Sequence, residues 1–186
     1  MTQYTLRLSF DLRQVTQTLA YEFVLPGNTG YAKEDGGPLA GTFNFQQTDD
    51  IVVEVLATSA ANLGPNTGPE DILKDFAVTN CTFVSIPATM TEDLSLFDAS
   101  SACSSVEDWK QIPPPPPKPN DNQKNLLRLC QRSNTPLPVA VKHGQWKISG
   151  YLSVELTTLD GKTHPQLYFF DPEGSSGNGG GGKHGG

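Results

Sequence analysis

Apolar and polar residues alternate along several short stretches of the chain, which is typical of strands with one buried face. Leu6, Leu8 and Phe10 stand at alternate positions within residues 4–10 and predict an opening strand. Short apolar runs predict further strands at residues 20–25, 41–45, 50–57, 75–87, 145–156 and 166–171. The pattern predicts an all-β fold, an antiparallel two-layer β-sandwich of about seven strands, with a small barrel as the alternative.

Three local signals refine this prediction. The polar residues 46–49 predict a hairpin between the third and fourth strands. The pair Asp160 and Gly161 predicts a turn between the last two strands. The alternation of the fifth strand slips near Asn80, which indicates a β-bulge.

Residues 92–141 interrupt the alternation with a long excursion that contains the proline run of residues 113–119. Structureless loops of this length are uncommon in compact domains, so part of the excursion is expected to be ordered. The run matches the Pro-x-x-Pro-x-Lys pattern of polyproline ligands. We interpret it instead as a stiff spacer, because a proline run is extended by itself.

One short helix is predicted inside this excursion, at residues 122–131. Leu126, Leu127 and Cys130 have helix-like spacing, and Asn120 or Asp121 could cap the first turn.

Composition favours a single domain. The 186 residues are 36% hydrophobic and 18% charged, and 18 Gly and 15 Pro interrupt the apolar runs. Residues 1–173 are expected to form one β-sandwich domain. Residues 174–186 are rich in glycine and carry no apolar side chain, so they are expected to be a disordered tail.

Charge and targeting signals exclude several partners. A net charge of −7 opposes binding to nucleic acid. The chain shows no signal-peptide pattern and no apolar run long enough to span a membrane, so a cytoplasmic location is expected. Cys81, Cys103 and Cys130 form no Cys-x-x-Cys pair and are predicted to be reduced thiols.

The glycine-rich residues 177–183 match part of the phosphate-binding loop motif of nucleotide-binding proteins. Gly177, Gly182 and Lys183 satisfy Gly-x-x-x-x-Gly-Lys, but His184 replaces the Ser or Thr that would hold Mg²⁺, and we expect no helix whose N-terminus could hold the phosphate. No cofactor is therefore predicted.

Catalytic and metal signals are weak. His143, His164 and His184 lack the spacing of a zinc pair, so no metal is predicted. No Gly-x-Ser-x-Gly elbow is present, although a triad assembled from distant residues stays open as a hydrolase hypothesis. The adjacent acids are interpreted as solvated turns or caps rather than a glycosidase pair, because neighbours on a strand face opposite sides. These acids are Asp49–Asp50, Glu92–Asp93 and Glu107–Asp108.

Aromatic side chains near the end of the chain give the best indication of an interaction surface. If Tyr168 and Phe170 share one face of the last strand, Phe169 takes the other, so the strand is covered on both sides or exposes an aromatic ring. The alternative is that most of these rings belong to the core. The candidate surface comprises Trp146, Tyr151, Tyr168, Phe169 and Phe170.

The late strand Trp146-Lys-Ile-Ser-Gly-Tyr-Leu and the terminal Tyr168-Phe-Phe-Asp-Pro-Glu173 resemble bacterial inclusion-body proteins of the AidA/PixA type. The resemblance is specific over residues 145–174, and the proline run and glycine tail depart from it. It implies a cytoplasmic bacterial protein that accumulates in inclusions, with no catalytic residues to transfer.

Three functional hypotheses follow from the sequence. The first is a non-enzymatic β-sandwich that associates with its own copies. The second is a binding module for a carbohydrate or another small molecule, in which the long excursion forms one wall of a pocket. The third is the hydrolase.

Overall fold

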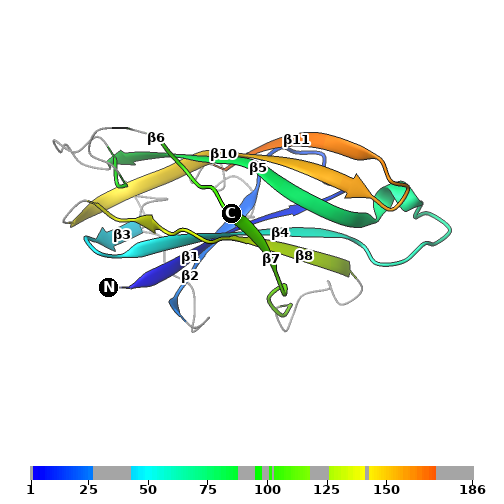
Figure 1. Cartoon of the computed structure of the whole chain (residues 1–186), viewed down its shortest axis with the longest axis horizontal. Helices are drawn as coiled ribbons and strands as arrows, with labels where there is room; N and C mark the ends of the chain where they lie inside the picture. The colour runs from blue at the N-terminus through cyan, green and yellow to red at the C-terminus, as the bar shows by residue number, and fades with distance from the viewer. Residues whose placement is uncertain are drawn as a thin grey trace, which may run out of the picture.

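Two packed β-sheets make up the part of the chain that the computed structural model describes (Figure 1). The described residues are 2–26, 43–87, 95–97, 101, 103–117, 126–140 and 143–170. No helix in these segments is long and apolar enough to cross a membrane.

The first sheet has six strands in the order β2-β1-β4-β8-β7, with β9 beside β4. All its pairs are antiparallel except β1 with β4, which run parallel. The strands are β1 (Gln3–Asp11), β2 (Ala20–Val24), β4 (Asp50–Ala60), β7 (Trp109–Ile112), β8 (Leu126–Ser133) and β9 (Leu137–Pro138).

The second sheet has five strands in the order β11-β10-β5-β6, with β3 beside β10, and all its pairs are antiparallel. A 3-10 turn, η3 (Pro69–Asp71), precedes β5. The strands are β3 (Phe43–Gln46), β5 (Leu73–Pro87), β6 (Cys103–Ser105), β10 (His143–Thr158) and β11 (Thr163–Phe170). The predicted all-β sandwich is confirmed, with one parallel pair that the sequence did not indicate.

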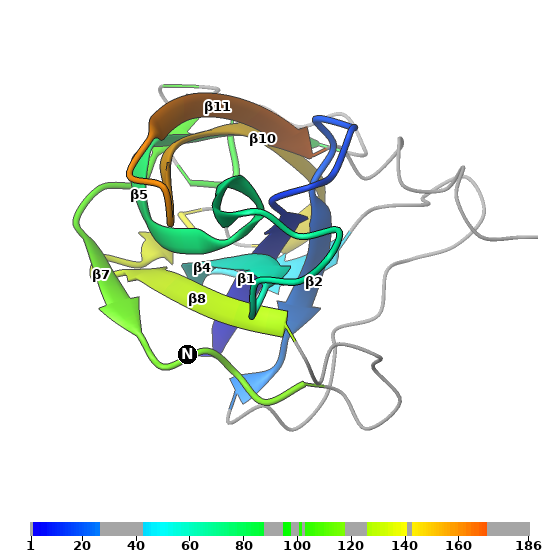
Figure 2. The same ribbon diagram turned by 90° about the vertical axis from the view of Figure 1, so that its right-hand side faces the viewer.

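The core lies between the two sheets, because β5, β10 and β11 curve over β1, β4 and β8 (Figure 2). Alternate residues of β1, namely Leu6, Leu8 and Phe10, point inward and are buried. They share the core with Phe83 of β5 and Leu152 of β10. The predicted alternation of the opening strand is confirmed.

The backbone also joins the sheets along one side. Phe169 of β11 donates a hydrogen bond to the carbonyl of Gln17 and accepts one from the N–H of Leu19, at 2.9 and 2.8 Å. The segment that leads into β2 of one sheet therefore covers the outer edge of β11 in the other. Such cover protects an edge strand from pairing with another chain.

Both local signals in the second sheet are confirmed. Ser153 pairs with Asn80 whereas Val154 pairs with Val78, so Thr79 is the extra residue of a β-bulge. Gly161 has φ of +82°, which favours glycine, and its N–H donates to the carbonyl of Thr158 in the turn between β10 and β11.

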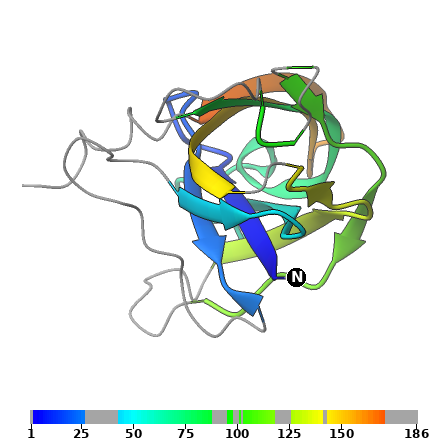
Figure 3. The same ribbon diagram turned by 90° about the vertical axis from the view of Figure 1, so that its left-hand side faces the viewer.

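The predicted hairpin at residues 46–49 is wrong. β3 pairs with β10, whereas β4 pairs with β1 and β8, so the connection crosses from one sheet to the other (Figure 3).

The expectation that part of the excursion at residues 92–141 is ordered is confirmed, because it supplies β6, β7, β8 and β9. The helix predicted at residues 122–131 is wrong, since Leu126–Ser133 is a strand between β4 and β7 in the six-stranded sheet. Inward positions of β8 include Gln131 and Ser133, whose polarity hid the alternation. Residues 118–125 and the tail at 174–186 lie outside the described residues.

Candidate functional sites

Four large apolar side chains are exposed on the outer face of the five-stranded sheet. They are Ile86 of β5, Tyr151 of β10, and Leu167 and Phe169 of β11, with exposed fractions of 53%, 56%, 49% and 39%. Tyr151 and Phe169 are direct partners in the register of β10 and β11. We call this group the aromatic face.

The aromatic face retains only two of the five aromatic residues predicted from the sequence, Tyr151 and Phe169. Trp146, Tyr168 and Phe170 are buried in the core. Tyr168 stacks on Phe10 with ring centroids 4.7 Å apart, and Phe170 meets Phe83 edge to face at 5.7 Å. Ile86 and Leu167 were missed, although Leu167 stands two positions before Phe169 and therefore shares its face.

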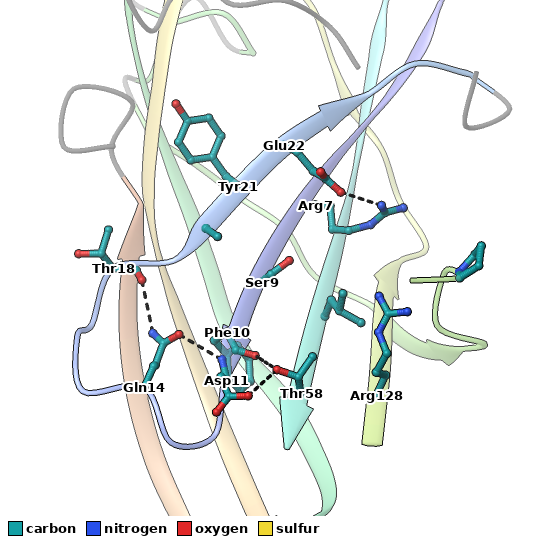
Figure 4. Close-up of a pocket in the computed structure, with 13 residues that line it drawn as sticks. Arg7, Ser9, Phe10, Asp11, Gln14, Thr18, Tyr21, Glu22, Thr58 and Arg128 are labelled. Atoms are coloured by element: carbon teal, nitrogen blue, oxygen red, sulfur yellow. Dashed lines mark hydrogen bonds and ion pairs between the residues drawn. The ribbon is translucent and has the colours of Figure 1, made fainter. Parts of the chain in front are cut away.

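A pocket of about 400 Å³ opens on the outer face of the six-stranded sheet (Figure 4). Its first wall is a row of charges that crosses three strands. Arg7 of β1 donates from Nη1 to Oε1 of Glu22 at 2.8 Å and from Nη2 to Oε2 of Glu54 at 2.9 Å. Burial lowers the pKa of the Arg7 guanidinium, but its bonds to Glu54 and Glu22 outweigh burial and raise that pKa above its ordinary value.

The floor of the pocket is the next row of the same face, which carries shorter side chains. Ser9 of β1 lies between Ala20 of β2 and Leu56 of β4 in the register. All three line the pocket. The cavity exists because this row is lower than the rows on either side of it.

The opposite wall is a row of polar groups on Asp11, Thr58 and Arg128, which are neighbours in the register of β1, β4 and β8. Thr58 Oγ1 donates to Asp11 Oδ2 at 2.8 Å. Gln14 closes this end, because its Oε1 accepts from the N–H of Asp11 at 3.1 Å and its Nε2 donates to the carbonyl of Thr16 at 2.7 Å.

The proline run lies against this wall. Arg128 Nη1 donates to the carbonyl of Pro115 at 2.5 Å, and Pro116 lines the pocket. Arg128 Nε is buried and has no hydrogen-bond partner among the residues that the structure describes. The described part of the run, residues 113–117, is thus attached to the sheet and contributes to a concave surface.

Groups that could hold a metal ion are not gathered in the described segments. No cluster of three or more His, Cys, Asp or Glu side chains that could hold a metal occurs there. His164 is exposed on β11, on the opposite sheet from the pocket, and His184 lies outside the described residues. Only the backbone of His143 is described.

The three cysteines are free thiols, as predicted. Burial raises the pKa of the Cys81 thiol, and burial together with the charge of Glu54 raises the pKa of Cys130 to about 12. Neither of these two thiols is therefore an activated nucleophile.

The adjacent acids agree only in part with the expectation that they are solvated turn or cap residues. Asp49 is buried, and its Oδ1 accepts a hydrogen bond from the N–H of Thr2 at 2.9 Å, so it is not a solvated turn residue. Glu107 and Asp108 are exposed, in agreement with the expectation, and Glu92 and Asp93 lie outside the described residues.

Comparison with known proteins found no matching family model, no matching curated protein and no matching solved structure. The function is therefore argued from the two surfaces described above.

Proposed function

We propose that this chain is a non-enzymatic β-sandwich protein that acts by associating with its own copies through the aromatic face. One observation carries the proposal, which is the exposure of Ile86, Tyr151, Leu167 and Phe169 on one side of a single sheet. The open face of a solvated antiparallel sheet is normally polar, and large exposed apolar side chains on such a face mark an interaction surface.

The charges around Tyr151 favour a second copy as the partner. Lys147 and Glu155 lie on the same face of β10, four residues before and four residues after Tyr151. Each charge is therefore about 13 Å from Tyr151 along the strand. In a two-fold pairing with antiparallel β10 strands centred on Tyr151, Lys147 of each copy lies opposite Glu155 of the other.

Light scattering at increasing protein concentration tests the proposal. We expect the molar mass of the wild type to rise above that of a monomer, and the double variant Tyr151→Ser/Phe169→Ser to stay monomeric. Val15→Ser is the matched control, because Val15 is 99% exposed but lies outside the aromatic face. A strictly monomeric wild type at high concentration would contradict self-association.

A charge exchange tests the proposed two-fold arrangement separately. Lys147→Glu and Glu155→Lys should each weaken association because they place like charges opposite one another. The combined Lys147→Glu/Glu155→Lys variant should restore it. Failure of the combined variant to recover association would rule out the antiparallel pairing.

The resemblance to AidA/PixA inclusion-body proteins supports the same proposal, since such proteins accumulate in inclusions. On the basis of this resemblance we also propose that the chain is bacterial and cytoplasmic. Light microscopy of cells that overproduce the chain should show inclusions for the wild type and fewer for Tyr151→Ser/Phe169→Ser.

Binding of a small molecule is a second candidate function, and the pocket favours it. The pocket has the size of a ligand site. Pro116, which belongs to the excursion at residues 92–141, forms part of its wall. A ligand-dependent rise in melting temperature across a panel of sugars and small organic acids would support this function.

A further inference from the structure

We propose that the pocket binds a small organic acid with a single negative charge, and that Arg128 holds its carboxylate. This inference deepens the second candidate function, since it names the class of ligand. It is independent of self-association, because the pocket and the aromatic face lie on opposite sheets.

The first step of the argument is that no described group supplies a counter-charge to Arg128. Its Nη1 donates to the neutral carbonyl of Pro115, and Nε is buried without an acceptor. No described carboxylate makes an ion pair with it, whereas Arg7 and Arg132 both pair with Glu54. A partly buried guanidinium without a carboxylate is an unfavourable arrangement that a bound anion would relieve.

The second step is that the space beside Arg128 can hold such an anion. Figure 4 shows the Arg128 side chain running from β8 toward the end of the pocket at which Arg7 lies. The low row of Ser9, Ala20 and Leu56 leaves a pocket of about 400 Å³. This volume is in the range of small-molecule sites.

The third step concerns the charge of the ligand. Asp11 and Glu22 also line the pocket, so a second negative charge would meet repulsion. A monocarboxylate matches one unpaired guanidinium, and a planar guanidinium binds a carboxylate through two parallel hydrogen bonds.

The fourth step concerns the rest of the molecule. Ala20, Leu56 and Pro116 give the lining an apolar part beside its polar groups. An organic acid with a small apolar body can contact both the polar and the apolar side chains of this lining, whereas inorganic phosphate can contact only the polar ones.

Benzoate and its neutral analogue benzamide provide a direct test with the full chain. We expect benzoate to shift the NMR resonance of the Arg128 Nε–H saturably, with a Kd of about 1 mM or tighter, and to raise the melting temperature. Benzamide and inorganic phosphate should have little effect. L-lactate provides a second, smaller acid.

Variants locate the binding. Arg128→Gln should weaken benzoate binding by about tenfold or more, because it removes a charge-assisted hydrogen bond, and Arg128→Lys should retain part of the affinity. Ser9→Leu should block binding by filling the floor without a change of charge. Arg13→Gln is the matched control, since Arg13 pairs with Asp71 and does not line the pocket.

Two outcomes would overturn the inference. One is the absence of saturable binding by both benzoate and L-lactate, and the other is equal binding of benzoate to the wild type and to Arg128→Gln. If glucose raises the melting temperature while neither acid does, the second candidate function is retained and only the proposal that the ligand is an organic acid is refuted. If none of these compounds binds, the second candidate function loses its support as well.

Discussion

The side-chain amide of Gln131 on β8 donates a hydrogen bond to the carbonyl of Phe76 on β5 at 2.6 Å. Its oxygen also accepts a hydrogen bond from the N–H of Val78 at 3.2 Å. Phe76 and Val78 lie beyond the short pairing of β5 with β6, which covers only Thr82 to Val84. Gln131 thus takes the place of a neighbouring strand and joins the two sheets.

Replacing Gln131 by leucine should destabilise the protein by about 2–3 kcal/mol, because it leaves one backbone donor and one acceptor of β5 without partners. Gln111→Leu is the matched control, since Gln111 is exposed on β7 and pairs with Gln131 in the register. Urea unfolding of both variants measures the difference. Equal free energies of unfolding would show that water replaces the Gln131 hydrogen bonds without cost.

Phe170 and Phe169 are adjacent in sequence but lie in opposite environments. Phe170 is 1% exposed and sits beside Gly150, where a Cβ would lie 3.0 Å from its Cε1 atom. Phe170→Ala should therefore destabilise by about 3–5 kcal/mol, as is typical of a buried aromatic ring.

Phe169→Ala should cost about 1 kcal/mol or less, because the ring lies on the surface. Thermal and urea unfolding of dilute monomer compare the two variants. If Phe169→Ala destabilised the monomer as much as Phe170→Ala, the aromatic face would be part of the core and not an interaction surface.

The elements that sequence reasoning predicted are those in which burial and periodicity agree. β1 and β10 alternate regularly, and the bulge near Asn80 was visible because one extra residue reverses the pattern. β8 was misread because its inward positions Gln131 and Ser133 are polar. Their side chains hydrogen-bond to the backbone of β5 and β4, a role that local sequence does not reveal.

The pocket could not be predicted from the sequence. The pocket residues Arg7, Ser9 and Asp11 were visible only as the solvent-facing positions of a strand. What makes them a site is the register of β1 against β2 and β4, together with the attachment of the proline run to Arg128. Both depend on pairing between segments far apart in the chain.

The buried ion pair of Arg7 and Glu54 gives a further prediction. Arg7→Leu should destabilise by about 3–5 kcal/mol, because it leaves the carboxylate of Glu54 buried with Arg132, at 3.7 Å, as its one remaining ion-pair partner among the described residues. The double variant Arg7→Leu/Glu54→Leu should recover much of this loss, since neither charge remains buried. A double-mutant cycle by urea unfolding measures the recovery.

Arg13→Leu is the control for this experiment and should have only a slight effect, because Arg13 pairs with Asp71 at the surface. Additive losses from the Arg7 and Glu54 substitutions would contradict direct coupling between the two charges.

Tyr168 gives a prediction for alkaline pH. Burial, with a further contribution from the charge of Asp11, raises the pKa of Tyr168 to about 12. An unfolded tyrosine has a pKa of about 10, so the folded state holds this proton more tightly. The stabilising contribution is fully present below pH 10 and is lost as the pH rises from 10 towards 12.

Tyr168→Phe should therefore reduce the loss of unfolding free energy over this pH interval and remove the latest phase of tyrosine ionisation. Urea unfolding at several pH values and absorbance at the tyrosinate band measure the two effects. The substitution keeps the ring that stacks on Phe10, so a change in slope with pH reports on the hydroxyl alone. An unchanged slope would mean that the Tyr168 hydroxyl reaches solvent in the folded protein and that the ring is less deeply packed than its 2% exposure indicates.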